Sequence, residues 1–126
     1  MKHELSIRVI YALCLTGAAF NHLKTVLMHG LFWDYHHAPI FARFFWTSLT
    51  FLDPLAVILL FLKPKAGLIL TFLIIFVDVI HNTGILIYEK RDMLNSVQIA
   101  QCMFLCFVCV TIHIPWKAHQ LKIING

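Results

Sequence analysis

Charged residues are scarce in this sequence. Asp, Glu, Lys and Arg make up only 13% of its 126 residues, whereas 60% are apolar. Soluble domains carry about 25% charged residues, and a chain this short buries the smallest share of its surface on folding. The composition therefore excludes an ordinary soluble domain, a disordered chain and a secreted disulfide scaffold. It predicts a membrane protein with little mass outside the bilayer.

The sequence also lacks a cluster of basic residues. Ten Lys and Arg against six Asp and Glu give a formal charge of +4, but the basic residues occur singly or in pairs between apolar runs. That spacing is typical of charges that flank membrane spans and not of a DNA-binding stripe. We therefore expect no nucleic-acid partner.

A Cys-x-x-Cys pair is missing, which leaves the zinc and thiol-redox interpretations without their motif. The four cysteines all lie in apolar runs, where free Cys usually packs as a small apolar residue. We expect that role for Cys14, Cys102, Cys106 and Cys109.

Four apolar runs are present, each close to the roughly 20 residues that a helix needs to cross a bilayer. They predict an all-α, polytopic membrane protein whose single domain is an antiparallel bundle of four transmembrane helices. Pro115 is expected to close the last helix. The predicted helices are 6–27, 42–62, 66–88 and 94–114.

The distribution of Lys and Arg predicts the orientation of these spans. The side that holds both termini and the short second loop carries more Lys and Arg than the side that holds the first and third loops, so the positive-inside rule places both termini in the cytoplasm. We expect the plasma membrane, specifically a bacterial inner membrane. The one long loop, 29–39, is rich in aromatic residues and His, and is expected to lie in the membrane interface or to fold over the bundle as a lid.

Polar residues inside the predicted spans are few, and they converge on one level. Ionisable groups at such depth are costly and indicate function. Asp53 lies near the middle of the second span, and Asp78 and His81 near the middle of the third. The proposed catalytic set is Asp53, Asp78 and His81, and the proposed ligand-binding set is Asn21, His22, Trp46, Thr50, Asn82, Gln98 and Gln101.

The spacing within the helices explains these choices. Asp78, His81 and Asn82 share one face of the third span by their i, i+3, i+4 spacing, and Trp46, Thr50 and Asp53 share one face of the second. We expect one of the two Asp residues to be an acid, a base or a hydrogen-bonding anchor, with His81 as its partner. For Gln98 and Gln101 the alternative stays open that they only hold helices together through hydrogen bonds.

Several functions are compatible with such a pocket. The first is the binding, with or without turnover, of a small lipophilic ligand. A second is a haem- or metal-binding redox subunit that uses His22 and His81, since facing helices of a bundle can supply such ligands. Others are a proton-coupled transporter that acts as an oligomer, and an accessory or scaffold subunit with a membrane-protein partner. The sequence identifies no cofactor.

Five segments give the chain its resemblance to a known family. They are Arg-Val-Ile at 8–10, Phe-Phe-Trp-Thr-Ser-Leu at 44–49, Leu-Asp-Pro-Leu at 52–55, Pro-Lys-Ala-Gly at 64–67 and Asp-Val-Ile-His-Asn at 78–82. In length, number of spans and sparse polar positions the chain resembles the small bacterial four-helix membrane proteins called DoxX-like. DoxX is associated with quinone-linked thiosulfate oxidation. The resemblance thus implies a four-helix fold and favours a quinone or another lipid-like ligand.

Overall fold

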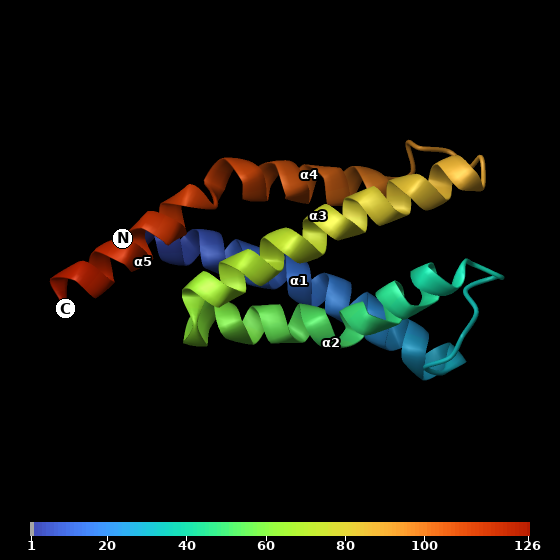
Figure 1. The fold of residues 1–126 in the computed structure, drawn as a ribbon, viewed down its shortest axis with the longest axis horizontal. Helices are drawn as coiled ribbons and strands as arrows, with labels where there is room; N and C mark the ends of the chain where they lie inside the picture. The colour runs from blue at the N-terminus through green and yellow to red at the C-terminus, as the bar shows by residue number, and fades with distance from the viewer. Residues whose placement is uncertain (1) are drawn as a thin grey trace.

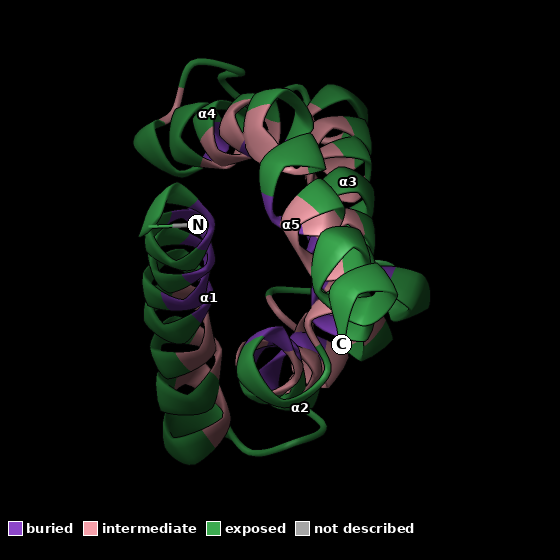
Figure 2. Ribbon diagram, turned by 90° about the vertical axis from the view of Figure 1, so that its left-hand side faces the viewer, coloured by how far each residue is buried: buried purple, intermediate pink, exposed green. Residues whose placement is uncertain are grey.

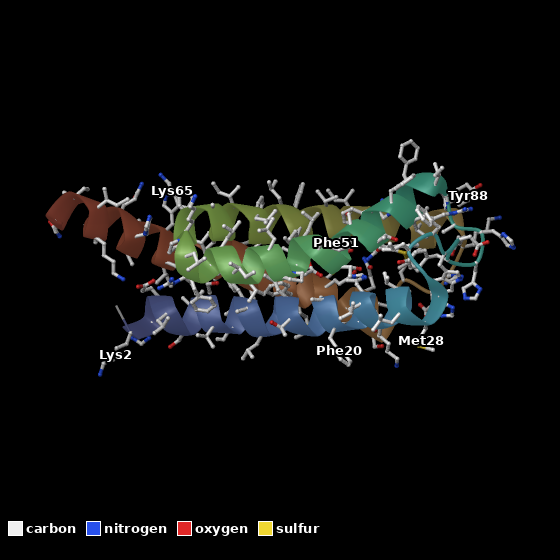
Figure 3. The ribbon with its side chains drawn as sticks, turned by 90° about the horizontal axis from the view of Figure 1, so that it is seen from below. Lys2, Phe20, Met28, Phe51, Lys65 and Tyr88 are labelled. Atoms are coloured by element: carbon white, nitrogen blue, oxygen red, sulfur yellow. The ribbon has the colours of Figure 1, made fainter. Side chains whose placement is uncertain are left out.

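The computed structural model describes residues 2–126 and, over that range, contains helices and no strand. The helices are α1 (Lys2–His29), α2 (Ile40–Leu62), α3 (Pro64–Tyr88), α4 (Ser96–Thr111) and α5 (His113–Asn125). The predicted all-α class is confirmed. Helices α1 to α4 alternate in direction, so that both termini and the α2–α3 turn lie at one end, which we call the termini end (Figure 1). Figure 3 shows Lys2 and Lys65 there, with Met28 and Tyr88 at the opposite, loop end.

Three helical stretches are long and apolar enough to cross a membrane: α2, α3, and α4 taken together with α5. This finding agrees with a helical membrane protein that has several candidate membrane-spanning segments. Within the described chain α1 does not meet the same measure, although its 28 residues are long enough. The polar residues Asn21, His22 and Lys24 in its second half lower the mean hydropathy of that helix.

Local sequence signals determine where the helices begin. The side chain of Asn95 accepts a hydrogen bond from the backbone N–H of Gln98 (2.9 Å), and α4 therefore starts at Ser96, as N-capping by Asn dictates. Pro64 occupies the first turn of α3, the position where a missing N–H costs nothing. Pro54 lies inside α2, which stays a single helix through it.

The predicted end of the last helix was wrong. Pro115 does not close a helix; it lies in the first turn of α5, which continues to Asn125. The interruption falls earlier, at Ile112, between α4 and α5. A proline in the first turn of a helix displaces no intrahelical hydrogen bond, so Pro115 starts a helix here instead of ending one.

The buried residues face the inside of the helix assembly and the exposed ones face outward (Figure 2). Tyr11, Leu49 and Leu60 are fully buried, whereas Phe20 and Phe51 are more than 60% exposed. Large apolar side chains on so much of the outer surface are expected where lipid is the solvent. All four cysteines lie in helices but are exposed, so they act as small apolar residues without being buried in the core.

An ionic cluster ties the termini end together. Arg8 Nη2 lies 3.0 Å from Glu4 Oε2, and Arg8 Nη1 donates to the carbonyl oxygen of Leu60 at the end of α2 (2.9 Å). Lys122 Nζ of α5 lies 2.7 Å from Glu4 Oε1. Glu4 is 5% exposed, so its carboxylate joins α1, α2 and α5 in a partly dry setting.

We expect the stability that Glu4 contributes to be lost in acid. Burial raises the pKa of Glu4, but the hydrogen bond from Lys122 and the charge of Arg8 outweigh it and hold the pKa below its ordinary value of 4.5. Because the pKa is lower in the folded state, the contribution of Glu4 to the free energy of unfolding is complete above pH 4.5. This contribution disappears as the pH falls through the lowered pKa. In thermal unfolding scans, Glu4→Gln should have a lower Tm than the wild type at pH 7, and this Tm difference should shrink as the pH falls below 4.5. A Tm difference that does not change with pH would contradict this account.

Candidate functional site

A cavity of about 1070 Å³ lies between α1, α2, α3 and α4. It extends from Cys14 and Phe104, near the middle of the helices, to Asp92 and Asn95 at the loop end. Its volume is at the upper limit of ordinary small-molecule pockets, which measure about 300–1,000 Å³. Apolar surface predominates in its lining, although many polar side chains take part in it.

Eight of the ten predicted site residues line this cavity. They are Asn21 and His22 of α1, Trp46 and Asp53 of α2, Asp78 and Asn82 of α3, and Gln98 and Gln101 of α4. The two others, Thr50 and His81, are not part of its lining. Antiparallel helices therefore bring together the polar groups that the sequence places at similar depth.

Asp53 is buried and lacks hydrogen-bond partners. It is 1% exposed, and among residues 2–126 neither carboxyl oxygen has a hydrogen-bond partner. His22 Nε2 lies 4.0 Å from Asp53 Oδ2, too far for a hydrogen bond. A buried polar group without a partner costs about 1–3 kcal/mol, and such exceptions in native proteins call for an explanation.

Asp78 is the opposite case, because both of its oxygens accept hydrogen bonds. Asn82 Nδ2 donates to Oδ1 (3.0 Å) and Gln101 Nε2 donates to Oδ2 (2.9 Å). Asn82 Nδ2 also donates to Gln101 Oε1 (2.9 Å), which closes a ring of three side chains that we call the amide–carboxylate ring. Trp46 Nε1 donates to Asn82 Oδ1 (2.8 Å) and attaches α2 to the ring.

The two acids therefore have different roles in the cavity wall. Asp78 holds α3 and α4 together within a network in which its oxygens are all hydrogen-bonded. These contacts match the alternative interpretation of Gln101, in which it only links helices through hydrogen bonds. Gln98 likewise donates to Thr83 Oγ1 across the same two helices (2.6 Å). Asp53 is the acid that has a free acceptor to offer a ligand.

His81 lies apart from both acids. Its ring packs against Phe45 and Trp46, with centroid distances of 4.9 and 5.7 Å, and its Nε2 is buried without a hydrogen-bond partner in the described chain. The expected pairing of His81 with an Asp is thus not formed, because His81 faces the aromatic side of α2 while Asp78 and Asn82 face the cavity. His22 is the histidine that the structure brings to an acid. Thr50 is buried near Asp53 in α2, but outside the cavity lining.

The loop between α1 and α2 covers the loop end of the cavity with aromatic side chains. Trp33 stacks on His29 (centroids 3.9 Å apart), and Tyr35 lies 5.0 Å from Trp46. Trp33, Tyr35 and His36 all line the cavity. Tyr35, His36 and His37 have positive φ angles of 48°, 59° and 66°, a conformation that is uncommon for residues other than glycine.

Sequence reasoning did not assign cavity contacts to Trp33 or Tyr35, and it did not assign to Thr83 its hydrogen bond with Gln98. Hydropathy locates the spans but does not predict how a loop packs against them. The contact of Tyr35 with Trp46 therefore had no signal in the sequence beyond the aromatic content of the loop. Thr83 had a usable signal, because it lies next to Asn82 and one helical turn beyond Val79, at the depth of Gln98 on the antiparallel neighbour.

No three His, Cys, Asp or Glu side chains within residues 2–126 are close enough together to hold a metal ion. Comparison with known proteins gives no relative: no protein-family model matches the chain, and no curated protein or solved structure matches it. The function must therefore be argued from the geometry of the cavity.

Proposed function

We propose that this chain is a four-span protein of a bacterial inner membrane, with both termini in the cytoplasm, whose cavity binds a small lipophilic ligand such as a quinone or a lipid. Three apolar helical stretches support the membrane setting. As the fourth span we propose α1, which packs along α2 and lines the cavity with Asn21 and His22. The alternating helix directions bring both termini and the α2–α3 turn to one end, and the Lys and Arg residues at that end support a cytoplasmic location for it.

The observation that carries this proposal is the state of Asp53. A carboxyl group that is 1% exposed and without a partner in the described chain lies in the wall of a large, mostly apolar cavity. A ligand that brings a hydrogen-bond donor to Asp53 removes the cost of leaving that group unpaired. A quinone, which has acceptor oxygens only, would take its hydrogen bond from the ring N–H of His22, and its reduced quinol form would also donate an O–H to Asp53.

Any turnover of the ligand would use the same two residues. Asp78 is engaged at both oxygens by Asn82 and Gln101, so proton transfer there requires a broken network. Asp53 and His22, 4.0 Å apart, can both face one ligand and exchange a proton with it. The resemblance to DoxX-like proteins favours a quinone for this role. No contact in the described part of the chain specifically favours the haem, transporter or scaffold hypotheses.

We expect ligand retention to depend on Asp53. Native mass spectrometry of the protein released from nanodiscs should detect a bound small molecule on the wild type and about tenfold less of it on Asp53→Asn, since a hydrogen bond to a charged group contributes about 1.5–3 kcal/mol.

Asp34→Asn is the matched control for this experiment, because Asp34 lies in the α1–α2 loop and outside the cavity lining; it should retain the molecule. The proposal fails if the wild type carries no such molecule, or if Asp53→Asn carries as much of it as the wild type.

A further inference from the structure

One side of the cavity is bounded by α1 and α4, two helices that hardly touch each other. Near the termini end α1 and α4 meet at Tyr11, whose hydroxyl lies 2.6 Å from Thr111 Oγ1 and whose ring packs edge-on against Phe104. Towards the loop end the α1–α2 and α3–α4 hairpins diverge (Figure 1). Residues of both α1 and α4 nevertheless line the same cavity. The side of the cavity between these two helices therefore has little packing to close it.

Small residues line the cavity on these two helices. Gly17 and Ala18 of α1 and Ala100 of α4 are part of the lining. A Cβ atom built on Gly17 would meet nothing within 4 Å among the described residues. The space directly beside Gly17 is thus open to an added methyl group.

Small residues alone do not indicate a ligand, but Asp53 does. Its unpartnered carboxyl lines this same cavity, and in its ionised form it accepts hydrogen bonds and donates none. The lining contains four carboxylates, Asp53, Asp78, Glu89 and Asp92, and one Arg, Arg91, which is paired with Glu89 (2.8 Å). A headgroup that donates N–H or O–H fits this charge balance, and an anionic headgroup does not.

We propose that the gap between α1 and α4 is a lateral portal through which a single-chain amphiphile with an amine or hydroxyl headgroup enters the cavity from the bilayer. The headgroup donates to Asp53, and the chain lies along Gly17 and Ala100. This inference rests on the proposed function and adds the route of entry and the chemistry of the headgroup. A second protein helix is the less suitable occupant, because an apolar helix face brings no donor to a carboxyl that is 1% exposed.

The test uses three probes of equal chain length in phosphatidylcholine nanodiscs: 12-bromododecylamine, 12-bromododecanol and 12-bromododecanoate. Native mass spectrometry identifies each adduct by its bromine isotope pattern and follows its uptake and release over time. The wild type should take up the amine and the alcohol but not the carboxylate, and Asp53→Asn should bind the amine about tenfold more weakly.

Substitutions at two glycines test the portal itself. Gly17→Phe should slow uptake and release together by about tenfold, which corresponds to about 1.4 kcal/mol in the barrier. Because Gly17 also lines the cavity, lower occupancy with release as fast as in the wild type would contradict the portal. Gly17→Ala, which fits the same space, should exchange at the wild-type rate. Gly84→Phe is the matched control: Gly84 also has nothing within 4 Å of an added Cβ in the described chain, and it lies outside the cavity lining.

The outcomes separate the portal from the proposed function. If the amine binds through Asp53 but Gly17→Phe exchanges it at the wild-type rate, the portal is refuted and the binding site stands. Equal binding of the carboxylate refutes the headgroup assignment. If native mass spectrometry shows a dimer of the wild type and Gly17→Phe is monomeric, the gap is an interface between two copies of the chain and the portal is refuted. If no probe binds, but the wild type still retains a native molecule that Asp53→Asn loses, the assignment of a single-chain amphiphile is refuted and the proposed function stands.

Discussion

Gly67→Ala should destabilise the protein by about 3 kcal/mol or more, at the upper end of the cost of overpacking. A Cβ atom on Gly67 would lie 2.6 Å from the carbonyl carbon of Leu59 and still closer to the backbone nitrogen of Leu60. These atoms belong to the last turns of α2, so the methyl group can be accommodated only if α2 and α3 move apart. Gly67 thus permits the close approach of the two helices directly after the turn at Lys63.

Thermal unfolding in a mild detergent, followed by circular dichroism, measures this effect. Gly84→Ala provides the comparison, because an added Cβ at Gly84 meets no described atom within 4 Å. In that open position, alanine should stabilise α3 by about 0.5–1 kcal/mol through its lower backbone entropy cost. If the Gly67→Ala protein is as stable as the Gly84→Ala protein, α2 and α3 do not approach each other closely enough at Gly67 to exclude a methyl group.

The depth of the polar residues could be predicted from the sequence, but their partners could not. Helices of similar length and alternating direction bring Asp53, Asp78 and Gln101 to one level regardless of packing detail, and all three line the cavity. Which donor reaches which acid depends on how each helix is rotated about its axis. Rotation places Asn82 against Asp78 and turns His81 towards Phe45, and the apolar residues around the rest of α3 carry no pattern that determines this rotation.

Contacts between residues far apart in the sequence were also beyond sequence reasoning. Glu4 and Lys122 are separated by 118 positions, and their ion pair exists because α5 continues past Pro115 and returns to the start of α1. The sequence indicated a proline after an apolar run, which is equally compatible with the end of one helix and the beginning of another.

The amide–carboxylate ring requires a residue at position 78 that accepts hydrogen bonds at both of its terminal side-chain atoms. Each Asn or Gln amide offers one donor atom and one acceptor atom. Asn82 uses its nitrogen for both of its ring contacts, and Gln101 uses its oxygen towards Asn82 and its nitrogen towards Asp78. The ring closes because Asp78 accepts at both oxygens. If residue 78 becomes Asn, every combination of amide orientations leaves two donors or two acceptors facing each other.

We therefore expect Asp78→Asn to destabilise the protein by about 1–3 kcal/mol, the cost of one unsatisfied buried group, despite the nearly identical size of Asn. Gln101→Glu should also be destabilising, since two carboxylates then face each other across α3 and α4. The double variant, Asp78→Asn with Gln101→Glu, moves the carboxylate to α4 and lets all three contacts pair again.

A double-mutant cycle of unfolding free energies measures this coupling. The double variant should be more stable than either single variant, with a coupling energy of about 1 kcal/mol or more, since the contact that each substitution breaks is formed again. Additive effects of the two substitutions would show that the ring does not act as a unit. Gln98→Glu combined with Asp78→Asn is the control, because Gln98 donates to Thr83 and is outside the ring, and in that pair the effects should simply add.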